Sequence, residues 1–163
     1  MSNIRGIRNN NPLNIIKGCN WKGERPIQKD KHFEEFESMQ MGIRAGIKLI
    51  RNHITGFNGK RPPANTIKKL ISVWAPVTEN NTEAYIRTVC QQTAIGRNEL
   101  LHANDRRSII AIARAMAYVE CGVWLEPELF ESASDLEGTY VATLEGVNDD
   151  GKKIEIEWEF EVK

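Results

Sequence analysis

The spacing of isoleucines between residues 43 and 54 constrains the fold of this chain more than any other feature of its sequence. Apolar residues that recur three and four positions apart lie on one face of an α-helix, which must pack against another element. We expect this helix to begin near Met41 and to stop at Gly56, because glycine readily leaves the right-handed helical conformation. Its apolar face consists of Ile43, Ile47, Ile50 and Ile54.

Three further segments repeat this periodicity, and each follows a residue type that caps a helix N-terminus. They begin after Asn65 or Thr66, after the run of residues 80–82 and after Asp105, and they end at Pro76, near Gly96 and at Gly122. The first 40 residues are rich in Asn, Gly, Pro and aromatic residues, which is typical of loops around one or two short strands. The sequence therefore predicts a body of helices with short N-terminal strands.

The last residues follow a different period. From Ile154 to Val162 apolar residues alternate with Glu, and a Lys flanks this run at each end, which indicates a half-buried strand. Residues 140–145 are its expected partner across a turn at 148–151, and such a hairpin must dock on the body or on another chain to be stable. The expected fold class is α+β, mainly α: a lysozyme-like helical body with short N-terminal strands and a C-terminal β-hairpin.

Charge divides the chain into the same two parts. Residues 1–125 carry 19 of the 22 Lys and Arg, whereas residues 126–163 carry 12 of the 22 Asp and Glu. We therefore expect a domain at 1–125 and an acidic hairpin appendage at 126–163. A basic body is suited to a polyanion, such as nucleic acid or an anionic cell-wall polymer, although a mixed solvated surface is an equally simple interpretation.

Several classes of protein are not favoured. The three cysteines and three histidines form no metal-ligand spacing, so we expect reduced thiols, no metal site and no cofactor. No apolar run is long enough to span a membrane. The N-terminus lacks the hydrophobic stretch of a signal peptide, so we expect no signal peptide.

Glu120 is the residue best placed for chemistry. It lies at the C-terminal end of the helix expected at 106–120, next to apolar residues, where burial and the helix dipole raise the pKa of a carboxyl group. Such an acid keeps its proton near neutrality and can donate it to a glycosidic oxygen. The structural alternative is a solvent-exposed glutamate in a frayed last turn.

Several motifs occur together in order. They are RGIRNNNPLNI at 5–15, WKG at 21–23, the aromatic run at 33–36, GIRA at 42–45, WAP at 74–76, ENNT at 79–82 and YI at 85–86. This string resembles a family of small lysozyme-like phage proteins known as structural protein P5 or virion-associated lytic transglycosylase. The family has glycine where this chain has Leu13, which predicts strain in the loop, and asparagine where it has Cys121.

A second resemblance concerns the order of the segments. Residues 11–17, 21–23 and 33–36 are similar to the middle of bacterial glucosaminidase domains, in which an Asn-Leu-Phe-Gly-Ile-Lys segment follows the helix with the catalytic glutamate. Here residues 109–122 look like that helix moved to the end of the domain. The resemblance thus implies a circularly permuted lysozyme-like fold with Glu120 beside the N-terminal loop.

The resemblance assigns roles to particular residues. Glu120 is the expected catalytic acid, and Asp30, Glu34 and Glu35 are candidates for a second carboxylate, with surface charges as the structural alternative. For Thr82 the alternative is a helix cap, and for the loop asparagines it is a turn. The expected substrate-binding residues are Asn11, Asn14, Trp21, Glu79, Thr82 and Tyr85.

Three functions remain open at this point. The first is a phage enzyme that cuts peptidoglycan glycan strands, as a lytic transglycosylase or a muramidase-like glycosidase. It would be carried in the virion or made in the host cytoplasm before release to the periplasm. The second is a non-catalytic virion or wall-binding protein, with other virion proteins as partners of the hairpin. The third, a nucleic-acid binder, is not favoured because no helix carries a basic stripe.

Overall fold

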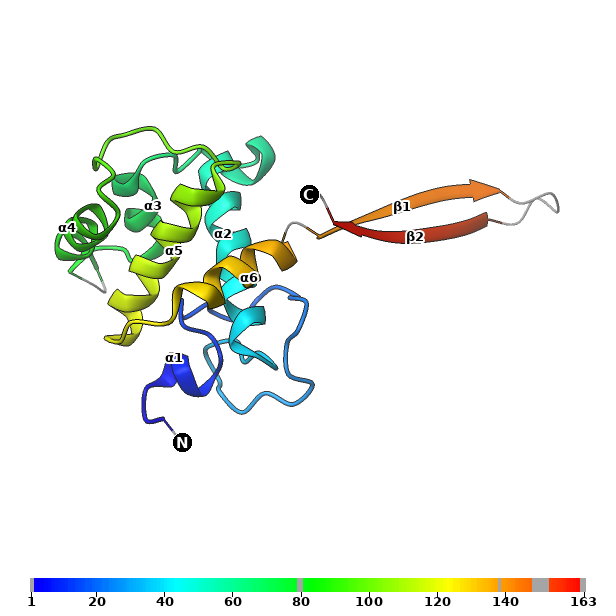
Figure 1. Cartoon of the computed structure of the whole chain (residues 1–163), viewed down its shortest axis with the longest axis horizontal. Coiled ribbons are helices and arrows are strands. Elements are labelled where there is room, and N and C mark those ends of the chain that lie inside the picture. Colours follow the sequence, from blue (N-terminus) through cyan, green and yellow to red (C-terminus); the bar gives the residue numbers. More distant parts are fainter. Residues whose placement is uncertain (1, 79–80, 138, 148–152, 162–163) are drawn as a thin grey trace.

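The computed structural model describes residues 2–78, 81–137, 139–147 and 153–161, and Figure 1 shows their course. The longest helix, α2 (Met39–Gly59), contacts three other helices of the body. Ser38 caps it by accepting a hydrogen bond from the amide of Met41 at 3.3 Å. All four isoleucines of the predicted apolar face are buried, which confirms this helix as a core element.

The right-handed course of α2 ends at Gly56, as predicted. Gly56 has φ 65°, and Phe57 and Asn58 also have positive φ. A Cβ atom at position 56 would lie 2.1 Å from the carbonyl oxygen of Arg61, so both the conformation and the close approach require glycine. The chain therefore turns back at this point.

The three other predicted helices are α3 (Ile67–Trp74), α4 (Thr82–Thr93) and α5 (Arg106–Cys121). Thr66, Asn81 and Asp105 cap them with their side chains, which confirms the predicted starts. The structure ends α4 at Thr93 rather than near Gly96, because Ala94 already takes a left-handed conformation. Gly122 caps α5 with φ 70°.

The body extends further than residue 125. Residues 127–137 form helix α6 (Pro127–Glu137), and its Phe130 and Ala133 are fully buried against the body. The Nε atom of Arg44, on α2, donates to the carbonyl oxygen of Leu136 at 3.2 Å. The predicted start of the appendage at residue 126 is therefore wrong. The acidic charge of this segment concealed its helical spacing of apolar residues.

The first 38 residues contain no strand among those described, contrary to the prediction. They hold the short helix α1 (Arg5–Arg8) and two isolated bridges, between Ile16 and Phe33 and between Glu24 and Phe36. Backbone hydrogen bonds join the two segments of the first bridge, from Glu34 to Ile15 and from Lys17 to His32, and the side chain of Asn11 contacts both segments. The Nδ2 atom of Asn11 donates to the carbonyl oxygens of Ile15 and Glu34, at 3.0 Å each.

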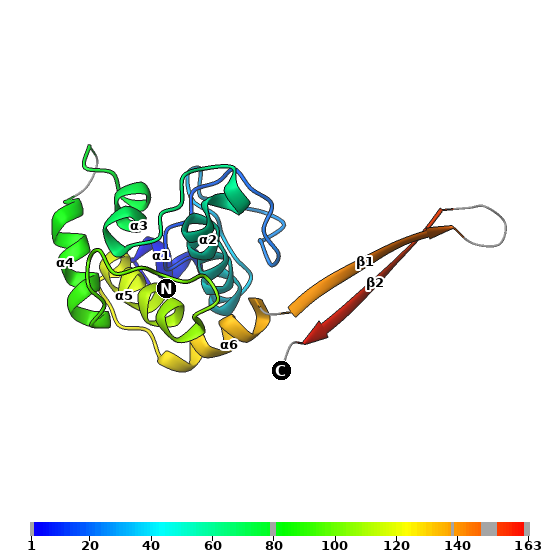
Figure 2. The same cartoon turned by 90° about the horizontal axis from the view of Figure 1, so that it is seen from above.

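The prediction of an α+β class is wrong. From residue 2 to residue 137, apart from 79–80, the structure has six helices and no strand, so the body is all-helical. Beyond it, β1 (Thr139–Val147) and β2 (Lys153–Glu161) pair antiparallel with each other alone, with Tyr140 opposite Phe160. Figures 1 and 2 show this ladder extending away from the helices, so it adds no sheet layer to the body. The predicted turn at 148–151 lies outside the described residues.

Candidate active site

The end of α5 and the N-terminal loop meet at Glu120. The Nδ2 atom of Asn14 donates to Oε2 of Glu120 at 2.8 Å, and the hydroxyl group of Tyr85, on α4, donates to Oε1 at 3.0 Å. Each carboxylate oxygen thus has one neutral donor. Asn14 and Glu120 are 106 positions apart in the sequence, so their contact confirms the expectation that Glu120 lies beside the N-terminal loop.

Burial has the largest effect on the pKa of the Glu120 carboxyl group. Glu120 is partly buried, and burial raises its pKa, while the hydrogen bonds from Asn14 and Tyr85 lower the pKa by less. Tyr85 is 6% exposed, and both burial and the nearby charge of Glu120 raise its pKa well above the ordinary value. The tyrosine therefore stays a hydrogen-bond donor, and Glu120 holds its proton to a higher pH than an exposed glutamate.

The position of Asn14 depends on a turn that Asn11 holds in place. Asn14 has φ 50°, a left-handed conformation that asparagine tolerates better than most residues. Asn11 is completely buried, and its Oδ1 accepts from the amide of Ile15 at 2.9 Å while its Nδ2 donates to two carbonyl oxygens. The predicted substrate-binding role of Asn11 is therefore wrong, since its amide is used up in the turn.

Leu13 is not strained, although the resemblance predicted strain there. The left-handed residue of this loop is Asn14, and Leu13 itself has no positive φ. Leu13 is fully buried, and a Cβ atom at Gly46 on α2 would lie 2.0 Å from its Cδ1 atom. Gly46 thus leaves the space that the leucine side chain fills, so the loop keeps its shape with the larger residue.

Close packing of α1 against the end of α5 fixes the other side of the loop. A Cβ atom at Gly6 would lie 2.7 Å from Sγ of Cys121 and 3.3 Å from Oδ1 of Asn14. The thiol of Cys121 donates to the carbonyl oxygen of Pro12 at 3.4 Å. Burial, with the nearby Glu120, raises the pKa of Cys121 to about 11, so the thiol stays protonated and acts as a packing and hydrogen-bonding group.

Among the described residues, no hydrogen bond joins Asn11, Trp21 or Thr82 to Glu120. Thr82 is 3% exposed, and its hydroxyl group donates to the carbonyl oxygen of Ala75 at 2.5 Å, which joins the end of α3 to the start of α4. Trp21 is partly buried and packs against the core. Glu79 lies outside the described residues. Of the six, the structure brings Asn14 and Tyr85 to the catalytic candidate.

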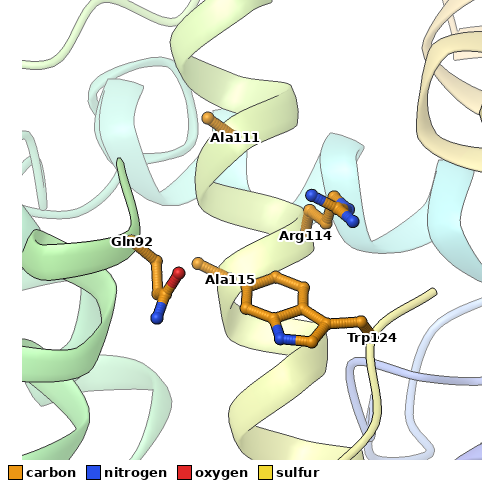
Figure 3. A pocket seen from close by; sticks show the side chains of 5 residues that line it. All are labelled: Gln92, Ala111, Arg114, Ala115 and Trp124. Atoms are coloured by element: carbon orange, nitrogen blue, oxygen red, sulfur yellow. The ribbon is translucent and has the colours of Figure 1, made fainter. Parts of the chain in front are cut away.

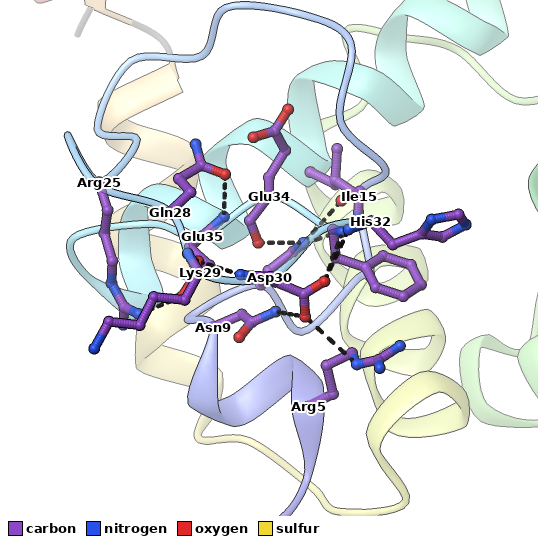
Figure 4. A network of polar contacts seen from close by, with 12 residues as sticks. Arg5, Asn9, Ile15, Arg25, Gln28, Lys29, Asp30, His32, Glu34 and Glu35 are labelled. Atoms are coloured by element: carbon purple, nitrogen blue, oxygen red, sulfur yellow. Dashed lines mark hydrogen bonds and ion pairs between the residues drawn. The ribbon is translucent and has the colours of Figure 1, made fainter.

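Asp30, a candidate second carboxylate, stabilises the loop that contains it. It accepts hydrogen bonds from the amides of His32 at 3.0 Å and Phe33 at 3.1 Å and from Nδ2 of Asn9 at 2.9 Å, and it pairs with Arg5 at 3.4 Å (Figure 4). The hydrogen bond from His32 is the main reason why the pKa of Asp30 falls to about 2, and those from Asn9 and Phe33 lower it further against a smaller opposing effect of burial.

Glu35 is held in the same loop. Burial raises its pKa, but hydrogen bonds from the amides of Asp30, at 2.8 Å, and Lys29, together with Arg25 at 3.0 Å, lower it below the ordinary value. Burial raises the pKa of Glu34, whose carbonyl oxygen accepts from Asn11. In the part of the chain that the structure describes, no hydrogen bond or ion pair joins Asp30, Glu34 or Glu35 to Glu120.

Two hollows among the described residues of the body were not predicted from the sequence. One, of about 410 Å³, lies between α4 and α5, and Figure 3 shows the side chains of Gln92, Arg114 and Trp124 around it. The ring of Trp124 stacks on Tyr118 at 4.3 Å, and the guanidinium of Arg114 lies 4.8 Å from the indole centre. The four-residue spacing of Arg114 and Tyr118 on a helix was the available signal. The other hollow lies beside α1.

In the part of the chain that the structure describes, no group of three or more His, Cys, Asp or Glu side chains is arranged to hold a metal ion. No helix in that part of the chain combines the length and the apolar character that a membrane span requires.

Comparison with known proteins gives one informative similarity. No protein-family model matches the chain. Over 111 residues the chain is 39% identical to Protein P5 of Pseudoalteromonas phage PM2, a match that covers 66% of this chain and 66% of that protein, just short of two thirds of its length. The shared segment is long and the identity is high enough to indicate common descent. This similarity supports a P5-like phage protein.

Proposed function

We propose that this protein cleaves the glycan strands of peptidoglycan, with Glu120 as general acid and then general base. The observation that carries the proposal is a partly buried carboxyl group with a raised pKa, held between two neutral donors. A carboxylic acid that holds its proton to a higher pH than an exposed glutamate is suited to protonate a glycosidic oxygen. The family resemblance points to the same residue.

In the proposed reaction Glu120 donates its proton to the oxygen between two sugars, and the bond from the anomeric carbon to that oxygen breaks. The carboxylate then removes a proton from the 6-hydroxyl of the muramoyl residue, whose oxygen bonds to the anomeric carbon and closes an anhydro sugar. Asn14 and Tyr85 donate to the carboxylate that forms, and this stabilises it after the proton has left.

The surroundings of the other acids favour this intramolecular route over hydrolysis. A glycoside hydrolase needs a second carboxylate about 5–10 Å from the first, to act as nucleophile or base. Asp30 and Glu35 are engaged by backbone amides and arginines of their own loop. A single acid is sufficient when the attacking hydroxyl group belongs to the substrate, so we infer a lytic transglycosylase rather than a muramidase-like hydrolase.

A phage protein of this kind acts either from the virion or from within the infected cell. We infer that it is carried in the virion or accumulates in the host cytoplasm until it is released to the periplasm, and that its C-terminal strands contact other virion proteins. The alternative function is a non-catalytic virion or wall-binding protein that keeps the fold. That alternative is favoured by Cys121, which stands where the family has asparagine, directly after the catalytic candidate.

Digestion of purified peptidoglycan tests the proposal. Wild-type protein and Glu120→Gln are incubated with the polymer, and the soluble fragments are identified by mass spectrometry. We expect anhydro-muropeptides from the wild type and none from Glu120→Gln. Fragments with reducing ends would instead establish a hydrolase. Equal release by both proteins would remove Glu120 from the mechanism, and no release by either would leave the non-catalytic wall-binding role.

A further inference from the structure

A cavity of about 550 Å³ lies beside α1, among side chains that the proposed reaction does not use. It is formed by the C-terminal end of α1 and by the loop of residues 25–35. Figure 4 shows that the side chains of Arg25 and Lys29 extend on the same side of this loop. The lining residues that matter here are Arg8, Arg25, Ile27, Lys29, Asp30 and Glu35.

The charges that line the cavity differ in how fully they are paired. Asp30 and Glu35 accept from backbone amides and pair with arginines, and Arg25 also donates to the carbonyl oxygen of Arg8 at 3.2 Å. For the guanidinium of Arg8 and the ammonium of Lys29, the described part of the chain supplies no hydrogen bond or ion pair. The cavity thus offers two unpaired cations beside two fixed carboxylates.

This mixed lining favours a ligand that itself carries both signs. Carboxylates of the ligand pair with Arg8 and Lys29, and an ammonium group of the ligand is attracted to Asp30 and Glu35. A densely charged phosphate is disfavoured by the two carboxylates. Ile27, which is 79% exposed at the cavity, offers an apolar contact to a peptide chain. We propose that this cavity binds the short peptide that peptidoglycan carries on its muramoyl residues, an inference that rests on the proposed function.

The helix α1 connects the cavity to the candidate active site. Its Gly6 packs against Cys121 and Asn14 beside Glu120, and its last residue, Arg8, lines the cavity. Four helical residues span about 6 Å, whereas an extended peptide of four residues reaches about 13 Å. A muramoyl residue bound at Glu120 can therefore place its own peptide along α1 in the cavity.

Calorimetric titration of the full chain with the synthetic wall tetrapeptide L-Ala-γ-D-Glu-meso-diaminopimelyl-D-Ala tests this binding. We expect saturable binding by the wild type and a dissociation constant at least about tenfold higher for Arg8→Gln/Lys29→Gln, because two charged pairs are lost. The matched control is Lys48→Gln/Lys68→Gln, which removes the same charge from exposed positions outside the cavity and leaves the affinity unchanged. Circular dichroism verifies that each variant is folded.

The inference is overturned if the wild type shows no saturable binding, if both double variants bind the tetrapeptide equally, or if inorganic phosphate competes at the same concentration. A failure of the peptide-binding inference can be distinguished from a failure of the proposed function. Glu120→Gln is expected to bind the tetrapeptide with wild-type affinity while it cleaves nothing. Binding without cleavage by the wild type would end the enzymatic proposal alone, and cleavage without binding would end the peptide site alone.

Discussion

Glu120 and the pair Asp30 and Glu35 are carboxyl groups in two regions of one small body, yet their surroundings shift their pKa values in opposite directions. Glu120 has burial and two neutral donors, and its pKa is raised. Asp30 and Glu35 have backbone amides and arginines as partners, and their pKa values are lowered. The number and the charge of the hydrogen-bond donors, rather than burial alone, decide the direction of the pKa shift. They distinguish a carboxyl group that still holds a proton to donate from a carboxylate that stabilises a loop.

The largest expected difference between the two regions is in activity. Glu120→Gln should lower the rate of release of soluble fragments from peptidoglycan by at least about 100-fold, because the proton donor is lost. Glu35→Gln leaves the proton donor in place and should therefore change the rate per folded molecule far less. Turbidity loss of a peptidoglycan suspension measures both rates. A Glu35→Gln protein that is folded but inactive would contradict this division of roles.

The free energy of unfolding should rank the two variants in the reverse order, with the larger loss in Glu35→Gln. Glu35→Gln should lower the free energy of unfolding at neutral pH by about 2 kcal/mol, since a buried carboxylate loses charged hydrogen bonds. Because the pKa of Glu35 is lowered by folding, its contribution is present above the ordinary pKa of 4.5 and is lost as the pH falls through the folded-state value. Urea unfolding across this pH range measures it. A stability difference that does not decrease in acid would contradict the assignment.

How well the sequence predicts each region depends on how far apart in the sequence the interacting residues lie. The caps Thr66, Asn81 and Asp105 act over three residues, so the starts of three helices could be predicted from local sequence. Helix α6 was not predicted, because its acidic composition is typical of an exposed segment although its apolar spacing buries Phe130. The contact between Asn14 and Glu120 was expected only through a family resemblance, because local sequence carries no signal across 106 positions.

The roles of the polar loop residues were the least predictable. An asparagine side chain can bond a sugar or a backbone carbonyl equally well, and the partner depends on the tertiary fold. Asn11 turned out to be buried in its own turn, and Thr82 bonded to the end of α3. The lack of strain at Leu13 could not be predicted from its local sequence either, because the space for its side chain is provided by Gly46 on α2.

A smaller effect is expected from Tyr85→Phe. Loss of one hydrogen bond to a charged group should lower the rate about tenfold. Since this bond lowers the pKa of Glu120, its removal should raise that pKa and move the alkaline limb of the pH–rate profile to higher pH. The profile from acid to alkaline pH measures both effects. A shift to lower pH would contradict the donor role of Tyr85.

The smallest effect is expected at Asp30. Asp30→Asn should lower the free energy of unfolding by about 1 kcal/mol at neutral pH, because solvent screens part of the interaction behind its lowered pKa. That stability is present above pH 3.8 and is lost as the pH falls toward about 2. Thermal unfolding at several pH values measures the difference, and a wild-type protein that is no more stable than the variant at neutral pH would contradict the prediction.

The most direct test of the account is the pKa of Glu120 itself. Carbon-13 NMR of the side-chain carboxyl groups, with Glu120→Gln and Asp30→Asn used for assignment, follows both titrations in one sample. We predict that Glu120 titrates above the ordinary glutamate value of 4.5 while Asp30 titrates near 2. A Glu120 carboxyl group that titrates at or below 4.5 would contradict the central claim, because it would be ionised before any sugar chain could receive its proton.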